Sequence, residues 1–74
     1  MTVCDLKSGD KAVVLKVELP EEMQARLRYL NVYKGANVSV LKISLLKKTY
    51  LLQARSARVA IDRETAAGIR VWRT

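Results

Sequence analysis

Residues 36–45 have the sequence Ala-Asn-Val-Ser-Val-Leu-Lys-Ile-Ser-Leu, an alternation of apolar and polar side chains that changes phase half-way. Val38 and Val40 set the first phase, and the second is set by Leu41, Ile43 and Leu45. Successive side chains of a strand point to opposite faces, so this change would turn apolar residues to solvent unless the strand bulges or bends. Long bent strands are shared between the two halves of small β-barrels, and the segment therefore predicts such a barrel.

Four other segments alternate with period two and are predicted as further strands. In the N-terminal one, we expect Val13, Leu15 and Val17 to face the core. The apolar phase of the others consists of Tyr50, Leu52 and Ala54, then Ala57, Val59 and Ile61, and finally Ile69 and Val71, with Arg70 and Trp72 on the opposite face. Short turns are predicted between these elements, at residues 5–10, 33–35, 46–48 and 55–56.

Two helical segments are predicted between the strands. The first begins at residues 20–22, Pro-Glu-Glu, because proline suits the first turn and the acidic residues complement the positive end of the helix dipole. A single apolar stripe follows, made of Met23, Leu27 and Leu30. Asn31 stands where a left-handed residue can end the helix. The second segment is a short helical turn that Asp62 can cap and Gly68 ends.

These elements predict one domain over residues 1–74. The fold class is mainly β: a small five-stranded SH3-like barrel, with one α-helix inserted after the first strand and a short helical turn before the last strand. A chain of 74 residues and 8.3 kDa has no room for a second domain. At this size every apolar stripe is needed to build the core, so a structural role is sufficient to explain the apolar residues of these stripes.

The composition excludes several classes of function. Cys4 is the only cysteine and there is no histidine, which removes intramolecular disulfides, histidine-based acid–base catalysis and imidazole zinc sites. The longest apolar run is residues 12–15, far short of the roughly 20 residues that a membrane helix needs. The N-terminus lacks the pattern of a signal peptide, so a cytoplasmic domain without membrane insertion is expected.

The sequence offers no convincing metal, cofactor or catalytic site. Cys4 has neither a second cysteine nor a histidine near it, so a small apolar role at the start of the barrel is favoured over metal binding. Glu18, Glu21 and Glu22 are oxygen donors close in sequence, but the start of a helix already accounts for the last two. No nucleophile–base pair or phosphate-binding glycine loop is present, so an enzyme is not expected.

Surface patterns indicate a binding module instead. Three apolar side chains fall outside the inward phases or in a connection, namely Leu46, Leu51 and Trp72, and together with Leu45, Lys47 and Lys48 they are the candidate partner surface. The net charge is +7, and the basic residues of the second half favour an acidic partner. Solvated strand faces account for most such basic residues, and nucleic acid is disfavoured because only Tyr50 and Trp72 could stack on bases.

The order of these segments resembles the FeoA family of small proteins in bacterial and archaeal ferrous iron uptake. The resemblance extends from about Thr2 to Val71, and it rests on residues 5–10 (Asp-Leu-Lys-Ser-Gly-Asp), 26–32 (Arg-Leu-Arg-Tyr-Leu-Asn-Val), 34–40 (Lys-Gly-Ala-Asn-Val-Ser-Val) and 59–71. Turn and core positions of the family pattern fall on Gly9, Leu27, Leu30 and Gly35. Residues 44–49 depart from the pattern, because they lack the Pro-Leu-Gly-Asp-like loop that is typical between these strands.

The resemblance implies a non-enzymatic accessory or regulatory protein without catalytic residues or cofactors. It implies contact with FeoB, the ferrous iron transporter of the membrane, through its cytosolic GTPase portion, which would place the chain at the inner face of the membrane. Self-association through the same apolar surface stays open as an alternative. Two alternative functions also stay open: a small basic barrel that binds nucleic acid, and a metal-linked module related to the C-terminal domains of iron-dependent repressors.

Overall fold

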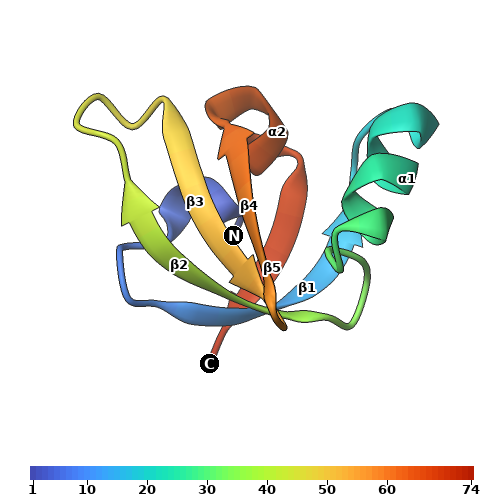
Figure 1. Cartoon of the computed structure of the whole chain (residues 1–74), viewed down its shortest axis with the longest axis horizontal. Coiled ribbons are helices and arrows are strands. Elements are labelled where there is room, and N and C mark those ends of the chain that lie inside the picture. Colours follow the sequence, from blue (N-terminus) through green and yellow to red (C-terminus); the bar gives the residue numbers. More distant parts are fainter.

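The computed structural model describes all 74 residues and consists of one five-stranded antiparallel sheet that curves into a partly open barrel (Figure 1). The strand order is β4-β3-β2-β1-β5, so β4 and β5 are the edges. The elements in chain order are the 3-10 helix η1 (Val3–Asp5), β1 (Lys11–Val17), α1 (Glu21–Tyr29), β2 (Asn37–Ile43), β3 (Thr49–Ala54), β4 (Ala57–Asp62), α2 (Arg63–Ala67) and β5 (Ile69–Arg73). This arrangement confirms the predicted mainly β fold with its two helical insertions; η1 was not predicted.

Both long strands bulge at the same short sequence. β2 shifts register against β3 between Val40 and Lys42, which confirms the bulge predicted from the change of phase. β1 shifts against β5 between Val14 and Lys16, where the chain repeats the pattern Val-Leu-Lys followed by a β-branched residue. At each bulge the leucine and the lysine both face solvent, and the next residue returns toward the core.

The bulge in β1 makes one prediction partly wrong. Ala12 and Val14 are buried, whereas Leu15 is 46% exposed and Val13 is only half-buried. Val17 does pack against the core as expected. The alternation therefore has the opposite phase before the bulge, because pairing with β5 leaves Leu15 as the extra residue on the outer face. Local alternation could not reveal this, since Val13 and Leu15 are more apolar than the alanine that is buried.

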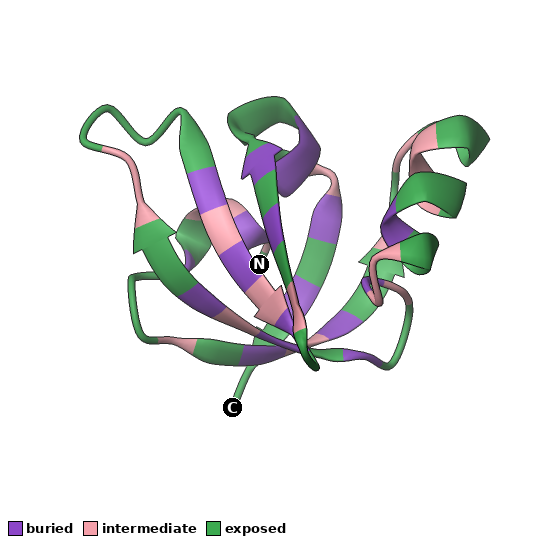
Figure 2. Ribbon diagram, in the orientation of Figure 1, coloured by how far each residue is buried: buried purple, intermediate pink, exposed green.

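The core fills the inside of the curved sheet, where buried and exposed residues alternate along the strands (Figure 2). The predicted inward residues of β3, β4 and β5 lie there: Tyr50, Leu52, Ala54, Val59, Ile61, Ile69 and Val71 are buried, and Ala57 is half-buried. Val38 and Val40 are buried as well. The alternation had suggested that Leu45 is part of the strand, which is wrong. β2 ends at Ile43, and Leu45 belongs to the following loop.

α1 lies at one side of the barrel and is only partly covered by it (Figure 1). Leu27 is the one buried residue of the helix, while Met23 and Leu30 of the predicted stripe are half-buried. Pro20 is the N-cap residue rather than part of the first turn. Asn31 has a φ of 70°, which confirms the predicted left-handed ending.

Turn glycines and the second helix follow the sequence pattern with one exception. Gly9 and Gly35 have φ values of 93° and 91°, so their turns need the left-handed freedom of glycine. Asp62 caps α2 as predicted, because its Oδ1 accepts the N–H of Thr65 at 2.7 Å. Gly68 ends α2 with a φ of −91°, which any residue can adopt. Position 68 needs glycine because there is no space for a side chain. An added Cβ would lie 2.7 Å from Leu19 Cγ and 3.0 Å from the carbonyl oxygen of Glu18.

Candidate functional site

The loop between β2 and β3 is a tightly bonded hairpin centred on Ser44. The Ser44 hydroxyl oxygen accepts the backbone N–H groups of Lys48 and Thr49, each at 3.0 Å. The Ser44 N–H donates to the carbonyl of Thr49 at 2.9 Å, and the Lys47 N–H donates to the carbonyl of Ser44 at 2.8 Å. Lys47 takes a φ of 55°, which closes the turn. These bonds tie the two ends of the loop together, in agreement with the tight connection predicted at residues 46–48.

The tip of this hairpin carries two apolar side chains in solvent. Leu45 is 99% exposed and Leu46 is 68% exposed, with Lys47 and Lys48 following in the same turn. Leu51 projects from the outer face of β3, where its neighbours across the sheet are Lys42 and Ala60. It lines a shallow hollow at the base of the hairpin together with Lys42, Ser44 and Thr49. We call Leu45, Leu46, Lys47, Lys48 and Leu51 the hairpin surface.

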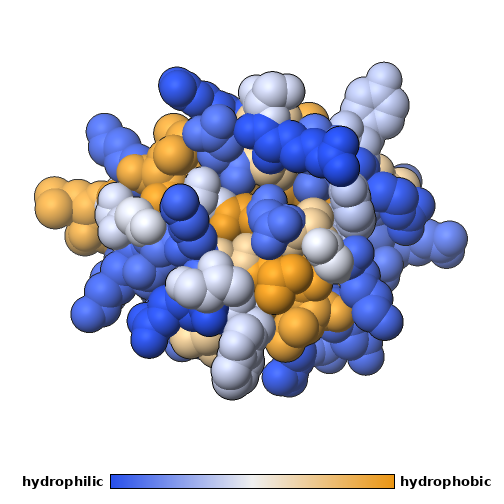
Figure 3. Space-filling view, turned by 90° about the horizontal axis from the view of Figure 1, so that it is seen from below, coloured by the Kyte–Doolittle hydropathy of each residue, from blue (hydrophilic) through white to orange (hydrophobic).

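Trp72, the remaining member of the predicted partner surface, lies elsewhere. It is 65% exposed on β5 and stands opposite Val13, which in turn stands opposite Asn37, the first residue of β2. The hairpin follows the last residue of β2, so the seven-residue strand separates the two, a length of roughly 20 Å at about 3.3 Å per residue. Seen from below, the apolar area at the end where the β2–β3 loop lies is separated by hydrophilic side chains from the apolar area near the centre (Figure 3).

The basic side chains do not form one continuous face. Lys42, Lys47 and Lys48 lie at the hairpin end, Arg55 and Arg58 lie in and after the β3–β4 turn, and Arg70 and Arg73 lie on β5. The two arginines of β5 have acidic partners. Arg70 Nε pairs with Glu18 Oε1, and Arg73 lies 3.8 Å from Asp10 Oδ2. The hydrogen bond from Arg70 lowers the pKa of the Glu18 carboxyl. The lysines of the hairpin end have no ion-pair partner and lie beside the exposed leucines of the loop.

The aromatic residues give little support to nucleic-acid binding. Tyr50 is 1% exposed, and burial raises the pKa of its phenol. Its ring is enclosed in the core and cannot stack on a base, which leaves Trp72 as the one stacking candidate of the two considered in the sequence. Cys4 is half-buried against the core with its Sγ 3.5 Å from the carbonyl oxygen of Arg63, in agreement with the small apolar role predicted for it.

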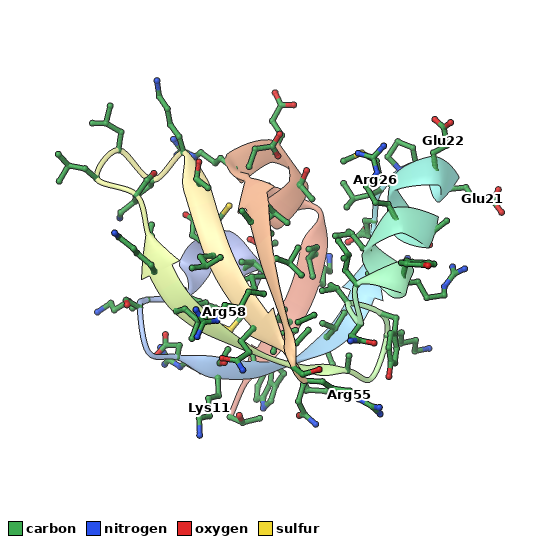
Figure 4. The ribbon with its side chains drawn as sticks, viewed as in Figure 1. Lys11, Glu21, Glu22, Arg26, Arg55 and Arg58 are labelled. Carbon is green, nitrogen blue, oxygen red and sulfur yellow. The ribbon has the colours of Figure 1, made fainter.

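No group of three or more His, Cys, Asp or Glu side chains is placed to hold a metal ion. Glu18 is engaged with Arg70, and Glu21 and Glu22 project from the first turn of α1 away from the barrel (Figure 4). No helix has both the length and the apolar character needed to cross a membrane.

The whole chain except its last residue, 1–73, matches the FeoA domain family. The chain belongs to the FeoA family. FeoA proteins are non-enzymatic accessory factors of ferrous iron transport, and the resemblance seen in the sequence is confirmed. A comparison with curated proteins found no match.

Solved structures of FeoA proteins have the same fold. The solution structure of the FeoA protein from Chlorobium tepidum is 30% identical in sequence with a TM-score of 0.90, over 96% of this chain and 68% of that one. The crystal structure of Stenotrophomonas maltophilia FeoA complexed with zinc is 28% identical with a TM-score of 0.80, over 97% and 89% of the two chains. That protein is described as a prokaryotic SH3-domain protein, which confirms the predicted SH3-like barrel.

A third structure, the iron(II) transport protein A of Clostridium thermocellum, is 17% identical with a TM-score of 0.88 and shows the fold alone. The alignment covers 96% of this chain and 44% of that one.

Proposed function

We propose that this FeoA protein acts by direct contact with a FeoB-type ferrous iron transporter, at the cytosolic GTPase portion, and that the hairpin surface makes the contact. The observation that carries the proposal is the pair Leu45 and Leu46, exposed at 99% and 68% at the tip of a hairpin that the hydrogen bonds of Ser44 hold together. Neither side chain contributes to the core, so the fold itself gives no reason for two adjacent leucines there.

The hydrogen bonds within the β2–β3 loop support a role in binding. A loop that is already fixed by the bonds of Ser44 loses little conformational freedom when a partner covers it, so more of the contact energy remains for affinity. Leucines that project from such a loop can enter an apolar pocket of the partner, while the shallow hollow beside Leu51 can receive a side chain in return.

The adjacent charges support an acidic partner surface. Lys47 and Lys48 have no acidic partner within the chain, and the net charge of the whole chain is +7. Charges at the rim of an interface mainly raise the association rate and make it sensitive to salt. Iron is the cargo of the transport system in this proposal, and the FeoA chain influences its passage through the transporter rather than by holding the ion.

The test is a calorimetric titration of this protein with the cytosolic GTPase portion of the FeoB from the same source. Leu46→Asp should abolish saturable binding, because it places a charge where an apolar pocket is expected. Trp72→Asp is the matched control, since it makes the same kind of change at a side chain that is 65% exposed but lies outside the hairpin surface. Lys47→Glu together with Lys48→Glu should weaken binding at low salt and remove most of the salt dependence of the affinity.

Three outcomes contradict the proposal. Binding that survives Leu46→Asp and fails with Trp72→Asp moves the contact to the β5 face. Concentration-dependent self-association that Leu46→Asp removes makes a second copy the occupant of the hairpin surface. Binding to random duplex DNA or RNA alone, with an affinity that collapses as salt is added, assigns the protein to the nucleic-acid class.

A further inference from the structure

β4 has a free edge that the structure leaves unpaired. β4 pairs with β3 alone and stands at the end of the sheet order. Thr49 stands opposite Asp62, and both its N–H and its carbonyl are bonded to Ser44 in the hairpin, so Thr49 and Asp62 form a non-hydrogen-bonded pair of the ladder. The bond from the Arg63 N–H to the Lys48 carbonyl beside this pair agrees with that assignment. Because bonded and non-bonded pairs alternate along an antiparallel ladder, Ile61, Val59 and Ala57 are bonded to β3. The backbone N–H groups of Arg58, Ala60 and Asp62 therefore point away from the sheet.

The middle of this edge is accessible. No hydrogen bond outside the β3 ladder involves the backbone of Arg58 or Ala60. The central outward residue is Ala60, whose side chain is too small to obstruct a neighbouring strand. Proteins usually protect a free edge with large charged side chains, with proline or with a covering element, and none of these stands at Ala60.

Beside the edge lies an apolar groove between β4 and α1, which we call the β4 groove. Its walls are Met23, Leu27 and Leu30 from the helix and Val59 and Ile61 from the strand, and its volume is about 240 Å³. Met23 and Leu30 are only half-buried because nothing in the chain covers the rest of the helix stripe. A volume of this size suits one or two aliphatic side chains rather than a cofactor.

The charges around the β4 groove favour an acidic occupant. Arg26 lines the groove and lies on the side of α1 that faces α2, whereas Glu21 and Glu22 point away from it (Figure 4). Asp62, the acidic residue of the lining, is engaged in capping α2 through Thr65. A second copy of the chain would bring another net charge of +7, which argues against self-association here.

We propose that the β4 groove binds an extended, acidic segment of a protein partner, which adds as a strand to the free edge of β4. The backbone of the segment pairs with the N–H and carbonyl groups of Arg58 and Ala60, its alternate aliphatic side chains enter the groove, and an acidic side chain meets Arg26. The lining of the β4 groove shares no residue with the hairpin surface, although Leu51 of that surface stands opposite Ala60 across the sheet. The test below uses a free peptide and no transporter, so its outcome does not depend on the proposed function.

The experiment is a nuclear magnetic resonance titration of the isotope-labelled protein with a peptide of alternating glutamate and valine, about eight residues long so that it spans the six-residue strand. The expected result is a saturable shift of the Arg58 and Ala60 amide signals and slower hydrogen exchange at both. The same peptide with lysine in place of glutamate should bind about tenfold more weakly or not at all. A peptide with proline at its centre should not protect the Ala60 amide.

Matched variants test the contribution of the β4 edge and that of the Arg26 charge separately. Arg26→Glu should weaken the acidic peptide about threefold to tenfold, whereas Arg28→Glu, the same change two residues further along the helix and outside the groove lining, should leave affinity within about twofold. Ala60→Pro removes an outward N–H without breaking a bond to β3, so it should abolish binding with the fold intact by its spectrum. Should Ala60→Pro fail to fold, Met23→Asp tests the groove wall in its place, and binding should again be lost.

The proposal is overturned by any of three results. The first is the absence of shifts at Arg58 and Ala60 up to about 1 mM peptide. The second is equal affinity for the glutamate and lysine peptides. The third is protection of the same amides on concentrating the protein without peptide, which would make a second copy the occupant.

Discussion

Replacing Gly68 by alanine should destabilise the fold by a steric clash rather than by backbone strain. The φ of Gly68 is −91°, so alanine can adopt its conformation. The added Cβ would lie 2.7 Å from Leu19 Cγ, about 0.7 Å inside the shortest ordinary contact of 3.4 Å. The carbonyl of Gly68 accepts the N–H of Glu18 at 2.6 Å, so the two segments cannot easily move apart. Leu19 must therefore turn away from the core surface against which it packs.

The expected loss follows from this displacement. Forcing one extra methyl into a packed site costs about 1–3 kcal/mol, and the smaller freedom of alanine in the unfolded chain returns about 0.4–1 kcal/mol. A net loss of about 1–2 kcal/mol lowers the melting temperature of a domain of this size by roughly 4–16 °C. That is a large part of the roughly 4–11 kcal/mol expected for a 74-residue chain.

The assay is a double-mutant cycle with Leu19→Ala, measured by urea unfolding. Removing the Leu19 side chain makes room for the new methyl, so the double variant should be more stable than the sum of the single losses predicts, by about 1 kcal/mol. Gly9→Ala is the control. Its φ is 93° and nothing lies within 4 Å of the added Cβ, so its loss comes from the left-handed conformation and should not respond to Leu19→Ala. Additive losses for Gly68→Ala and Leu19→Ala would refute the steric explanation.

Three further measurements test other parts of the structure. Leu52 is 0% exposed, so Leu52→Ala should lower the free energy of unfolding by about 2–5 kcal/mol in urea titrations, and a loss under about 1 kcal/mol would contradict its place at the centre of the core. Hydrogen bonding by Thr65 lowers the pKa of Asp62 below its ordinary value of 3.8, so the cap stabilises the fold fully above that pH and loses its effect as pH falls through the lowered value. Asp62→Ala should therefore lower the melting temperature near neutral pH but much less in strong acid, and an equal drop at both would speak against the charged cap. Burial raises the pKa of Tyr50 above 10.0, so stability should fall as pH rises beyond 10.0. In a pH titration followed by phenolate absorbance, Tyr50→Phe should remove the transition that occurs at the highest pH. An unchanged titration curve would show that this transition belongs to another tyrosine.

Much of the fold follows from local pattern alone. The alternation in β3, β4 and β5 identifies the buried residues, because a strand with one face in the core must alternate with period two wherever it does not bulge. The Asp62 cap and the left-handed Asn31 are equally local, since each depends on bonds or angles within a few residues. The change of phase in β2 even predicts a bulge, because a bulge is the local remedy for it.

The candidate surfaces could be predicted only in part. The exposure of Leu46 follows from its position in a short connection, where no strand can turn it inward. The exposure of Leu45 does not, because the alternation extended the strand to this residue whereas β2 ends at Ile43. The distance between these two leucines and Trp72 does not follow, because it depends on which residues of β1, β2 and β5 stand opposite one another. The β4 groove was not predicted at all, since it joins a helix and a strand that are about thirty residues apart in the chain.

The amino-acid sequence by itself determined the elements, their order and most of the core, because apolar period, capping and turn chemistry act between near neighbours in the chain. The family came from the resemblance of the ordered segments to the FeoA pattern. The tertiary structure alone decided the phase of β1, the reason for glycine at 68, the separation of Trp72 from the hairpin surface and the free edge of β4. Each of these depends on contacts between segments far apart in the chain. Strand register and edge position arise only when the sheet closes, since pairing sets which residues meet and which backbone groups are left without a partner.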